Sequence, residues 1–212
     1  MLYYDEVFLS IQGESRDSGL PTIFVRLFGC PFNCSYCDQP QTTKVKASIG
    51  TLLTKIRTFR GVDRVCITGG EPMLQDDCLP LAYELVSLGY KVSIETSGCV
   101  PIPFDTYKRS FRYVMDVKGP SSGPAMKHNK LDNLINLQSC DEVKFVVKDR
   151  EDYDYMRKIL KKYPTSASIL VSPMFKEDNT MYPESKDLVS WILEDKLDVR
   201  VQVQIHKMLQ CK

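Results

Sequence analysis

The chain has 212 residues, of which 43% are hydrophobic and 26% are charged, and its formal net charge is +1. This composition predicts one globular domain over residues 1–212 with a substantial core. The near-neutral charge argues against wholesale binding to nucleic acid or to an anionic membrane. No apolar run approaches the ~18 residues that a membrane span needs. The first residues lack the basic start of a secretory signal, so reduced cysteines and a cytoplasmic location are expected.

Strand-like and helix-like patterns alternate along the chain. Ser48 stands where a helix N-cap is expected, Asp76 or Asp77 can cap another helix, and Asp149 begins a charged helix. The patterns predict strands over 3–11, 22–28, 64–68, 91–95, 113–118, 142–147, 168–171 and 199–203. They predict helices over 48–60, 77–88, 131–137, 149–163 and 183–193.

This alternation predicts an α/β fold with a parallel sheet and helices packed outside it. A doubly wound sheet and a β/α barrel both fit. Six polar segments follow the ends of predicted strands, and these ends carry the site in β/α folds. Because six segments would meet more readily at one end of a barrel than in the crevice of a doubly wound sheet, the barrel is favoured. A full barrel typically takes ~250 residues, so we expect a partial parallel β/α barrel of about six β/α units, open on one side.

Three cysteines follow the second strand in a C-x3-C-x2-C spacing: Cys30, Cys34 and Cys37. Turn-forming residues between them suit a loop that wraps the thiolates around one metal centre. Structural zinc sites and ferredoxin clusters take four protein ligands, so three cysteines would leave one iron of a cluster open to another ligand. The remaining five cysteines are scattered and are interpreted as small buried hydrophobic residues.

The triplet resembles the cluster motif of the radical S-adenosylmethionine (SAM) enzymes, and Gly69-Gly70-Glu71-Pro72 resembles their second motif, which binds the SAM amino group. The resemblance implies that Cys30, Cys34 and Cys37 hold a [4Fe–4S] cluster. It implies that SAM chelates the fourth iron and is cleaved by an electron from the cluster. The cofactors carry the difficult chemistry, and the protein orients them.

Segments along nearly the whole chain resemble the 7-carboxy-7-deazaguanine synthase family: 8–14, 19–26, 95–98, 116–123 and 204–207. The resemblance implies a homodimer that converts 6-carboxy-5,6,7,8-tetrahydropterin into 7-carboxy-7-deazaguanine, with loss of ammonia, in 7-deazapurine (queuosine-type) biosynthesis. It also implies a flavodoxin-like or ferredoxin-like electron donor, with SAM regenerated in each turnover.

The resemblance also assigns residues. A planar guanidinium at Arg26 is suited to a substrate carboxylate, although a strand-end surface arginine is the plainer interpretation. His206 is equally open to a structural role. The substrate residues implied are Ile11, Gln12, Gly13, Arg26, Thr68 and His206. The SAM residues implied are Tyr36, Cys37, Asp38, Gly70, Glu71, Asp116, Val117 and Lys118.

Gln39 departs from the family pattern, which has Thr or Ser there as a Mg²⁺ ligand. An amide oxygen is an acceptable hard ligand, but it reaches further than a hydroxyl. The resemblance therefore implies Mg²⁺ at Gln39, and a shifted, water-bridged or absent ion stays open.

Two other functions fit the cysteine loop. A glycyl-radical-enzyme activase has the same spacing but needs a surface for a large protein partner. A non-enzymatic iron–sulfur or zinc-binding module would hold a metal centre that is indifferent to SAM.

Overall fold

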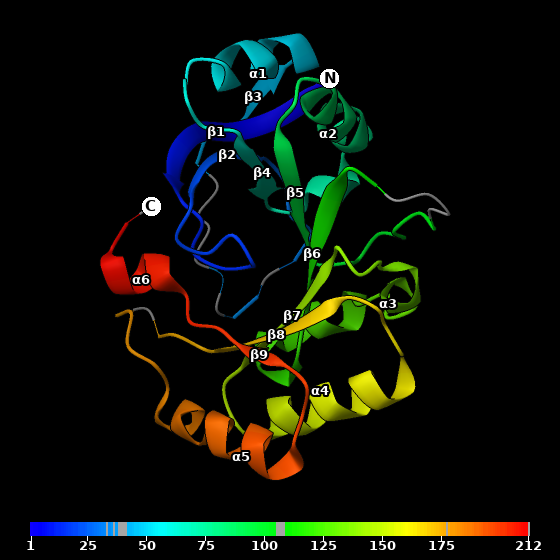
Figure 1. Ribbon diagram of the computed structural model, residues 1–212, viewed down its shortest axis with the longest axis vertical. Helices are drawn as coiled ribbons and strands as arrows, with labels where there is room; N and C mark the ends of the chain where they lie inside the picture. The colour runs from blue at the N-terminus through cyan, green and yellow to red at the C-terminus, as the bar shows by residue number, and fades with distance from the viewer. Residues whose placement is uncertain (33, 36, 38–41, 105–108, 177, 212) are drawn as a thin grey trace.

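The computed structural model describes residues 1–32, 34, 35, 37, 42–104, 109–176 and 178–211 (Figure 1). Nine strands form one sheet in the order β3-β1-β2-β4-β5-β6-β7-β8-β9. The strands are β1 (Leu2–Ile11), β2 (Pro21–Leu27), β3 (Val45–Ala47), β4 (Arg64–Gly69), β5 (Lys91–Thr96), β6 (Phe111–Val117), β7 (Glu142–Val147), β8 (Ser168–Pro173) and β9 (Arg200–Val201). The α-helices are α1 (Ile49–Ile56), α2 (Cys78–Ser87), α3 (Asn133–Asn136), α4 (Arg150–Lys162), α5 (Leu188–Asp195) and α6 (Ile205–Leu209), and the 3₁₀ helices are η1 (Pro72–Leu74), η2 (Pro120–His128) and η3 (Pro183–Asp187).

The connectivity makes the sheet an open barrel wall. From β2 through β4 to β9, each strand pairs in parallel with the next one along the chain. Because parallel crossovers are right-handed, stepping always in one direction puts every crossover on the same face. Figure 1 shows α1 to α5 around the outside of the curved sheet. The expected partial β/α barrel is confirmed, and the doubly wound alternative is wrong.

The two faces of the parallel strands differ in polarity. The outward face carries apolar side chains that are almost fully buried under the helices, including those of Val65, Ile67, Val92, Ile94, Met115, Val143 and Phe145. The inward face carries polar residues at the alternate positions. The strand register places Arg26 beside Thr68 and Asp116 beside Lys144. Since side chains alternate along a strand, one face builds the core and the other builds a polar interior.

Local capping explains where two of the predicted helices begin. The Ser48 side chain accepts a hydrogen bond from the backbone N–H of Thr51 at 3.1 Å, at the start of α1. The Asp149 carboxylate accepts from the backbone N–H of Glu151 at 3.0 Å, at the start of α4. The predicted N-cap at Ser48 is therefore confirmed, and the helix predicted to begin at Asp149 has this residue as its N-cap.

Three features differ from the sequence-based expectation. The β1–β2 hairpin is antiparallel, so the parallel sheet begins only at β2. Residues 45–47, where no strand was predicted, form β3, which pairs with the edge of β1. Beyond β9 the chain forms α6, where no helix was predicted, and the N–H of Ile205 donates to the carbonyl of Gly13 at 3.1 Å. Strand β3 and helix α6 lie against the hairpin, so their formation depends on distant partners that local patterns do not contain.

Candidate active site

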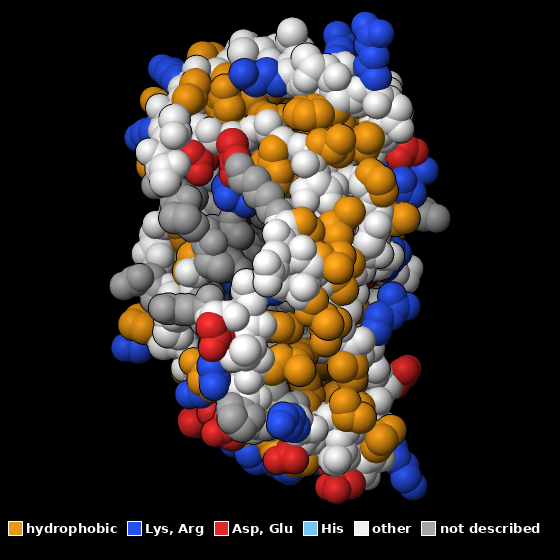
Figure 2. All heavy atoms as spheres, turned by 90° about the vertical axis from the view of Figure 1, so that its left-hand side faces the viewer, with side chains coloured by type: hydrophobic (Ala, Val, Ile, Leu, Met, Phe, Trp, Pro, Cys, Tyr) orange, Lys and Arg blue, Asp and Glu red, His pale blue; other side chains and the backbone are white. Residues whose placement is uncertain are grey.

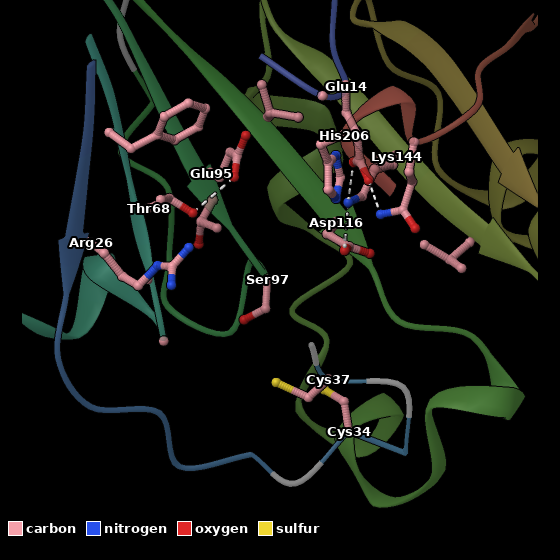
Figure 3. Close-up of a pocket in the computed structure, with 18 of the residues that line it drawn as sticks. Glu14, Arg26, Cys34, Cys37, Thr68, Glu95, Ser97, Asp116, Lys144 and His206 are labelled. Carbon is pink, nitrogen blue, oxygen red and sulfur yellow. Dashed lines mark hydrogen bonds and ion pairs between the residues drawn. The ribbon is translucent and has the colours of Figure 1, made fainter. Parts of the chain in front are cut away.

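A cavity of about 430 Å³ opens on the inner face of the sheet, at the carboxyl ends of the parallel strands. Its lining brings together polar groups from the β1–β2 hairpin, from β4 to β7 and from α6. Figure 3 shows Arg26, Thr68 and Glu95 on one side, Glu14, Asp116, Lys144 and His206 on the other, and Cys34 and Cys37 near Ser97. The strand ends therefore converge on one site, as β/α architecture requires.

The cysteine loop follows β2 and enters the cavity wall. Cys30, Cys34 and Cys37 all line the cavity, and none forms a disulfide. Burial raises the pKa of the Cys30 and Cys34 thiols above the ordinary value for cysteine. The loop is anchored to η2, because the Ser35 hydroxyl donates to the carbonyl of Ser121 at 2.5 Å.

The Gly69–Pro72 segment packs directly against the base of the cysteine loop. Gly69 has a φ of +132°, and a Cβ there would lie 2.0 Å from the carbonyl oxygen of Leu27, so no larger residue fits. The N–H of Glu71 donates to the carbonyl of Gly29 at 2.9 Å. Gly70 lines the cavity beside the thiols. The second motif is thus fixed to the first through the backbone.

Glu71 itself lies behind the cavity wall, with only 1% of its surface exposed. One carboxylate oxygen accepts from the Thr96 hydroxyl at 2.7 Å and from the N–H of Met73 at 3.0 Å. The other accepts from the backbone N–H and the hydroxyl of Ser97, at 2.7 and 2.5 Å. Glu71 therefore joins the loop after β4 to the loop after β5 rather than facing the cavity.

All six predicted substrate residues line the cavity. The Gln12 amide donates to one oxygen of Glu95 at 3.2 Å, and the Thr68 hydroxyl donates to the other at 2.8 Å. A Cβ on Gly13 would meet the ring of His206 at 1.8 Å, so the imidazole lies directly on this glycine. The β1–β2 hairpin, β4 and α6 thus present these groups to one space.

Arg26 reaches the cavity from β2 with part of its guanidinium already engaged. Its Nη1 lies 2.8 Å from a carboxylate oxygen of Glu6, and its Cζ lies 5.2 Å from the ring centre of Phe8. Its Nε is buried and has no hydrogen-bond partner in the described part of the chain. Glu6 and Phe8 therefore hold the guanidinium of Arg26 in place at the cavity wall.

Asp116 lines the opposite side of the cavity. Its Oδ2 lies 3.0 Å from Nζ of Lys118 and 3.2 Å from Nζ of Lys144. Burial would raise the pKa of this carboxyl, but the two ammonium groups hold it below its ordinary value. The buried Oδ1 has no hydrogen-bond partner among the described residues. Val117 points to the other face of the sheet and is fully buried in the core.

Comparison with known proteins places this site in a family. The family model of the radical SAM superfamily matches residues 25–164. The chain is 41% identical to the 7-carboxy-7-deazaguanine synthase of Methanospirillum hungatei, covering 96% of this chain and 83% of that protein. It is 38% identical to the enzyme of the same name from Koribacter versatilis, covering 96% and 95% respectively.

The chain belongs to the 7-carboxy-7-deazaguanine synthase family of radical SAM enzymes. Its fold is similar to the crystal structure of QueE from Escherichia coli, with a TM-score of 0.76 and 24% identity over 96% of this chain and 93% of that one. Membership of the radical SAM superfamily implies a [4Fe–4S] cluster and SAM as the cofactors. Within the described residues, no helix combines the length and the apolar composition needed to cross a bilayer.

The residues present fit these cofactors. Among the described residues, no three Cys, His, Asp or Glu side chains gather closely enough to ligate a single metal ion. In a four-iron cluster, however, each thiolate binds a different iron, so its ligands surround it rather than meet at one point. Three thiols line the cavity and would serve as ligands of the cluster, and the carboxylate of Asp116 lines the same cavity, where it would offer a polar contact to SAM.

Some predicted site residues lie outside the described part of the chain, namely Tyr36, Asp38 and Gln39. Conversely, sequence reasoning assigned no role to Glu14, Glu95 or Lys144, which all line the cavity. Glu95 lies near the end of β5 and is the first residue of the segment 95–98 that resembles the family, which was a usable signal. Lys144 lies within β7, and no local pattern marked it.

Proposed function

We propose that this chain is a 7-carboxy-7-deazaguanine synthase, which contracts the ring of 6-carboxy-5,6,7,8-tetrahydropterin with release of ammonia in 7-deazapurine biosynthesis. The observation that carries the proposal is the single cavity in which Arg26, Gln12 and Thr68 lie beside three unpaired thiols. When bound, the cluster and SAM supply a carbon radical that takes a hydrogen atom from the substrate and later returns it. Substrate and products differ by one ammonia molecule, so no net oxidant or reductant is needed.

The chain's own residues bind and orient the reactants. The guanidinium of Arg26 would donate to the substrate carboxylate, and Ile11, Gln12, Gly13, Thr68 and His206 would contact the rest of the pterin. Cys30, Cys34 and Cys37 would hold the cluster. On the SAM side, Gly70 and Asp116 would contact the cofactor together with Tyr36, Cys37, Asp38 and Lys118. Glu71 and Val117 would support that wall from behind, because neither lines the cavity.

The test is turnover by the isolated protein. Protein reconstituted anaerobically with iron and sulfide, then reduced in the presence of SAM and the carboxypterin, is expected to form 7-carboxy-7-deazaguanine and ammonia while SAM is not consumed. Product is followed by mass spectrometry and SAM by chromatography. Absence of the product from protein with a full cluster would refute the proposal. SAM cleavage that occurs only with a partner protein would favour a glycyl-radical-enzyme activase. A cluster whose absorption spectrum does not change when SAM is added would favour a non-enzymatic module.

Mg²⁺ is the least supported cofactor, because Gln39 replaces the hydroxyl residue of the family and lies outside the described residues. Adding Mg²⁺ to metal-free, cluster-loaded protein is expected to raise turnover, since an amide oxygen can ligate a hard cation. Gln39→Thr is the matched variant, and it should respond at lower Mg²⁺ because a hydroxyl oxygen lies closer to the backbone. Equal turnover with and without the ion in both proteins would remove Mg²⁺ from the reaction.

The same proposal includes partners and location. The β1–β2 hairpin and α6 carry exposed apolar side chains, among them Leu9, Leu20 and Met208. Figure 2 shows hydrophobic side chains gathered in a band on the side of the molecule that carries these elements. Such a band supports a homodimer formed by a single-domain chain.

Eight unpaired cysteines support a reducing cytoplasm as the location of the protein. The required electron would come from a flavodoxin-like or ferredoxin-like protein.

A further inference from the structure

Lys144 projects from β7 into the cavity and holds two carboxylates from different parts of the chain. Its Nζ lies 2.5 Å from Oε2 of Glu14 and 3.2 Å from Oδ2 of Asp116. Only 15% of the side chain is exposed. Burial alone would lower the pKa of this lysine, but the negative charges of Asp116, Glu14 and Glu95 raise it well above its ordinary value. The side chain is therefore an ammonium ion throughout the working pH range.

Each of the two carboxylates belongs to a different part of the site. Glu14 follows Gly13 in the chain, and its Oε1 accepts a hydrogen bond from the amide of Gln204, at the start of α6. It therefore belongs with the hairpin and α6, which carry five of the six proposed substrate residues. Asp116 also pairs with Lys118, and its second oxygen is unpaired among the described residues. It belongs to the proposed SAM wall.

One hydrogen bond and three ion pairs form a continuous series of contacts from the start of α6 to the loop after β6, and its central part is drawn in Figure 3. Lys144 is the central member of this series, because its ammonium group contacts both carboxylates. Without the ammonium group, the carboxylates of Glu14 and Asp116 would face the same space with no cation between them, although Asp116 would keep its ion pair with Lys118. Their side chains would separate or take up protons, and the two walls would lose their common anchor.

We propose that Lys144 is a positioning residue that couples two parts of the cavity. Through Glu14 it contacts the substrate residues of the hairpin and α6, and through Asp116 it contacts the SAM residues, so that the carboxypterin and SAM bind with positive cooperativity. This inference rests on the proposed function. A ligand that orders Glu14 also fixes Lys144 and, through it, Asp116, which leaves less to be ordered when the second ligand binds. By linkage, each ligand then raises the affinity for the other by the same factor.

The test measures binding rather than turnover. The dissociation constant of SAM is determined by calorimetry on anaerobic, cluster-loaded protein without reductant, with and without saturating carboxypterin, so that no chemistry occurs. In the wild-type protein the carboxypterin is expected to tighten SAM binding by about 5- to 150-fold, the usual range of coupling between two sites. In Lys144→Met the ratio should fall toward one, and Lys144→Arg, which keeps the charge, should restore part of it.

Two further variants test whether the change in the ratio is specific to Lys144. Lys144→Met combined with Glu14→Gln removes one charge of each sign, so it remains informative if the single variant does not fold. Lys158→Met changes an exposed lysine on α4 and should leave the ratio at the wild-type value. A wild-type ratio of one, or an unchanged ratio in folded, cluster-loaded Lys144 variants, would overturn the coupling role. Product formation by the wild-type protein is measured in parallel, so that failure of the proposed function is recognised separately.

Discussion

Cys34→Ala is expected to give a folded protein that holds no stable [4Fe–4S] cluster and makes no detectable 7-carboxy-7-deazaguanine. Each of the three thiolates would bind a separate iron, so losing one leaves two irons without a protein ligand. The fold should survive, because the loop is anchored through other groups. Ser35 bonds to η2, and the ring of Phe32 lies 4.6 Å from that of His128.

The measurement is iron and sulfide content after reconstitution, the absorption spectrum of the cluster, and product formation. Cys140→Ala is the matched control, because Cys140 is also an unpaired, partly exposed cysteine but does not line the cavity. It should keep the wild-type cluster and turnover. Full activity in Cys34→Ala would show that the triplet is not the cluster seat, and the central assignment would be lost.

Arg26→Lys is expected to lower kcat/KM for the carboxypterin by roughly 10- to 100-fold, the loss of a charge-assisted hydrogen bond of about 1.5–3 kcal/mol. Lysine keeps the positive charge, but it lacks the planar fork that pairs with a carboxylate. The existing contacts of Arg26 with Glu6 and Phe8 fix the position of the guanidinium, so a flexible ammonium cannot reproduce its geometry. The affinity for SAM should change little, because Arg26 lies across the cavity from Asp116 (Figure 3).

The decisive comparison uses a pterin that lacks the 6-carboxylate. The wild-type protein should bind the carboxylated compound much more tightly than this analogue, whereas the Arg26→Lys variant should discriminate far less. Arg60→Lys, at an exposed arginine outside the cavity, is the control for a general effect of the substitution. If the variant kept the wild-type preference, the carboxylate would be bound by another group.

The sequence predicted the elements that depend on local chemistry. Apolar alternation marked the strands, and side-chain caps at Ser48 and Asp149 marked the starts of α1 and α4. The spacing of Cys30, Cys34 and Cys37 marked the proposed cluster loop, because one short segment carries all three thiols. These features need only neighbours within a few residues, so they can be read from the chain itself.

Other features depend on pairs that are distant in sequence. Gln12 and Glu95 are separated by 83 residues, and Glu14 and Lys144 by 130. Whether Lys144 faces solvent, core or cavity is decided by the register of β7 between β6 and β8, since a shift of one residue reverses the face. The site roles of Glu14, Glu95 and Lys144 were therefore not predictable from local patterns.

By itself, then, the sequence determined the β/α order, the three-thiol loop and the Gly69–Pro72 segment that packs against it. Only the tertiary structure decided that the hairpin is antiparallel, that α6 lies against Gly13, and that Lys144 joins Glu14 to Asp116. The physical reason is that the proposed cluster loop draws on thiols a few residues apart, whereas the polar interior is assembled by side chains that meet only when the sheet curves around them.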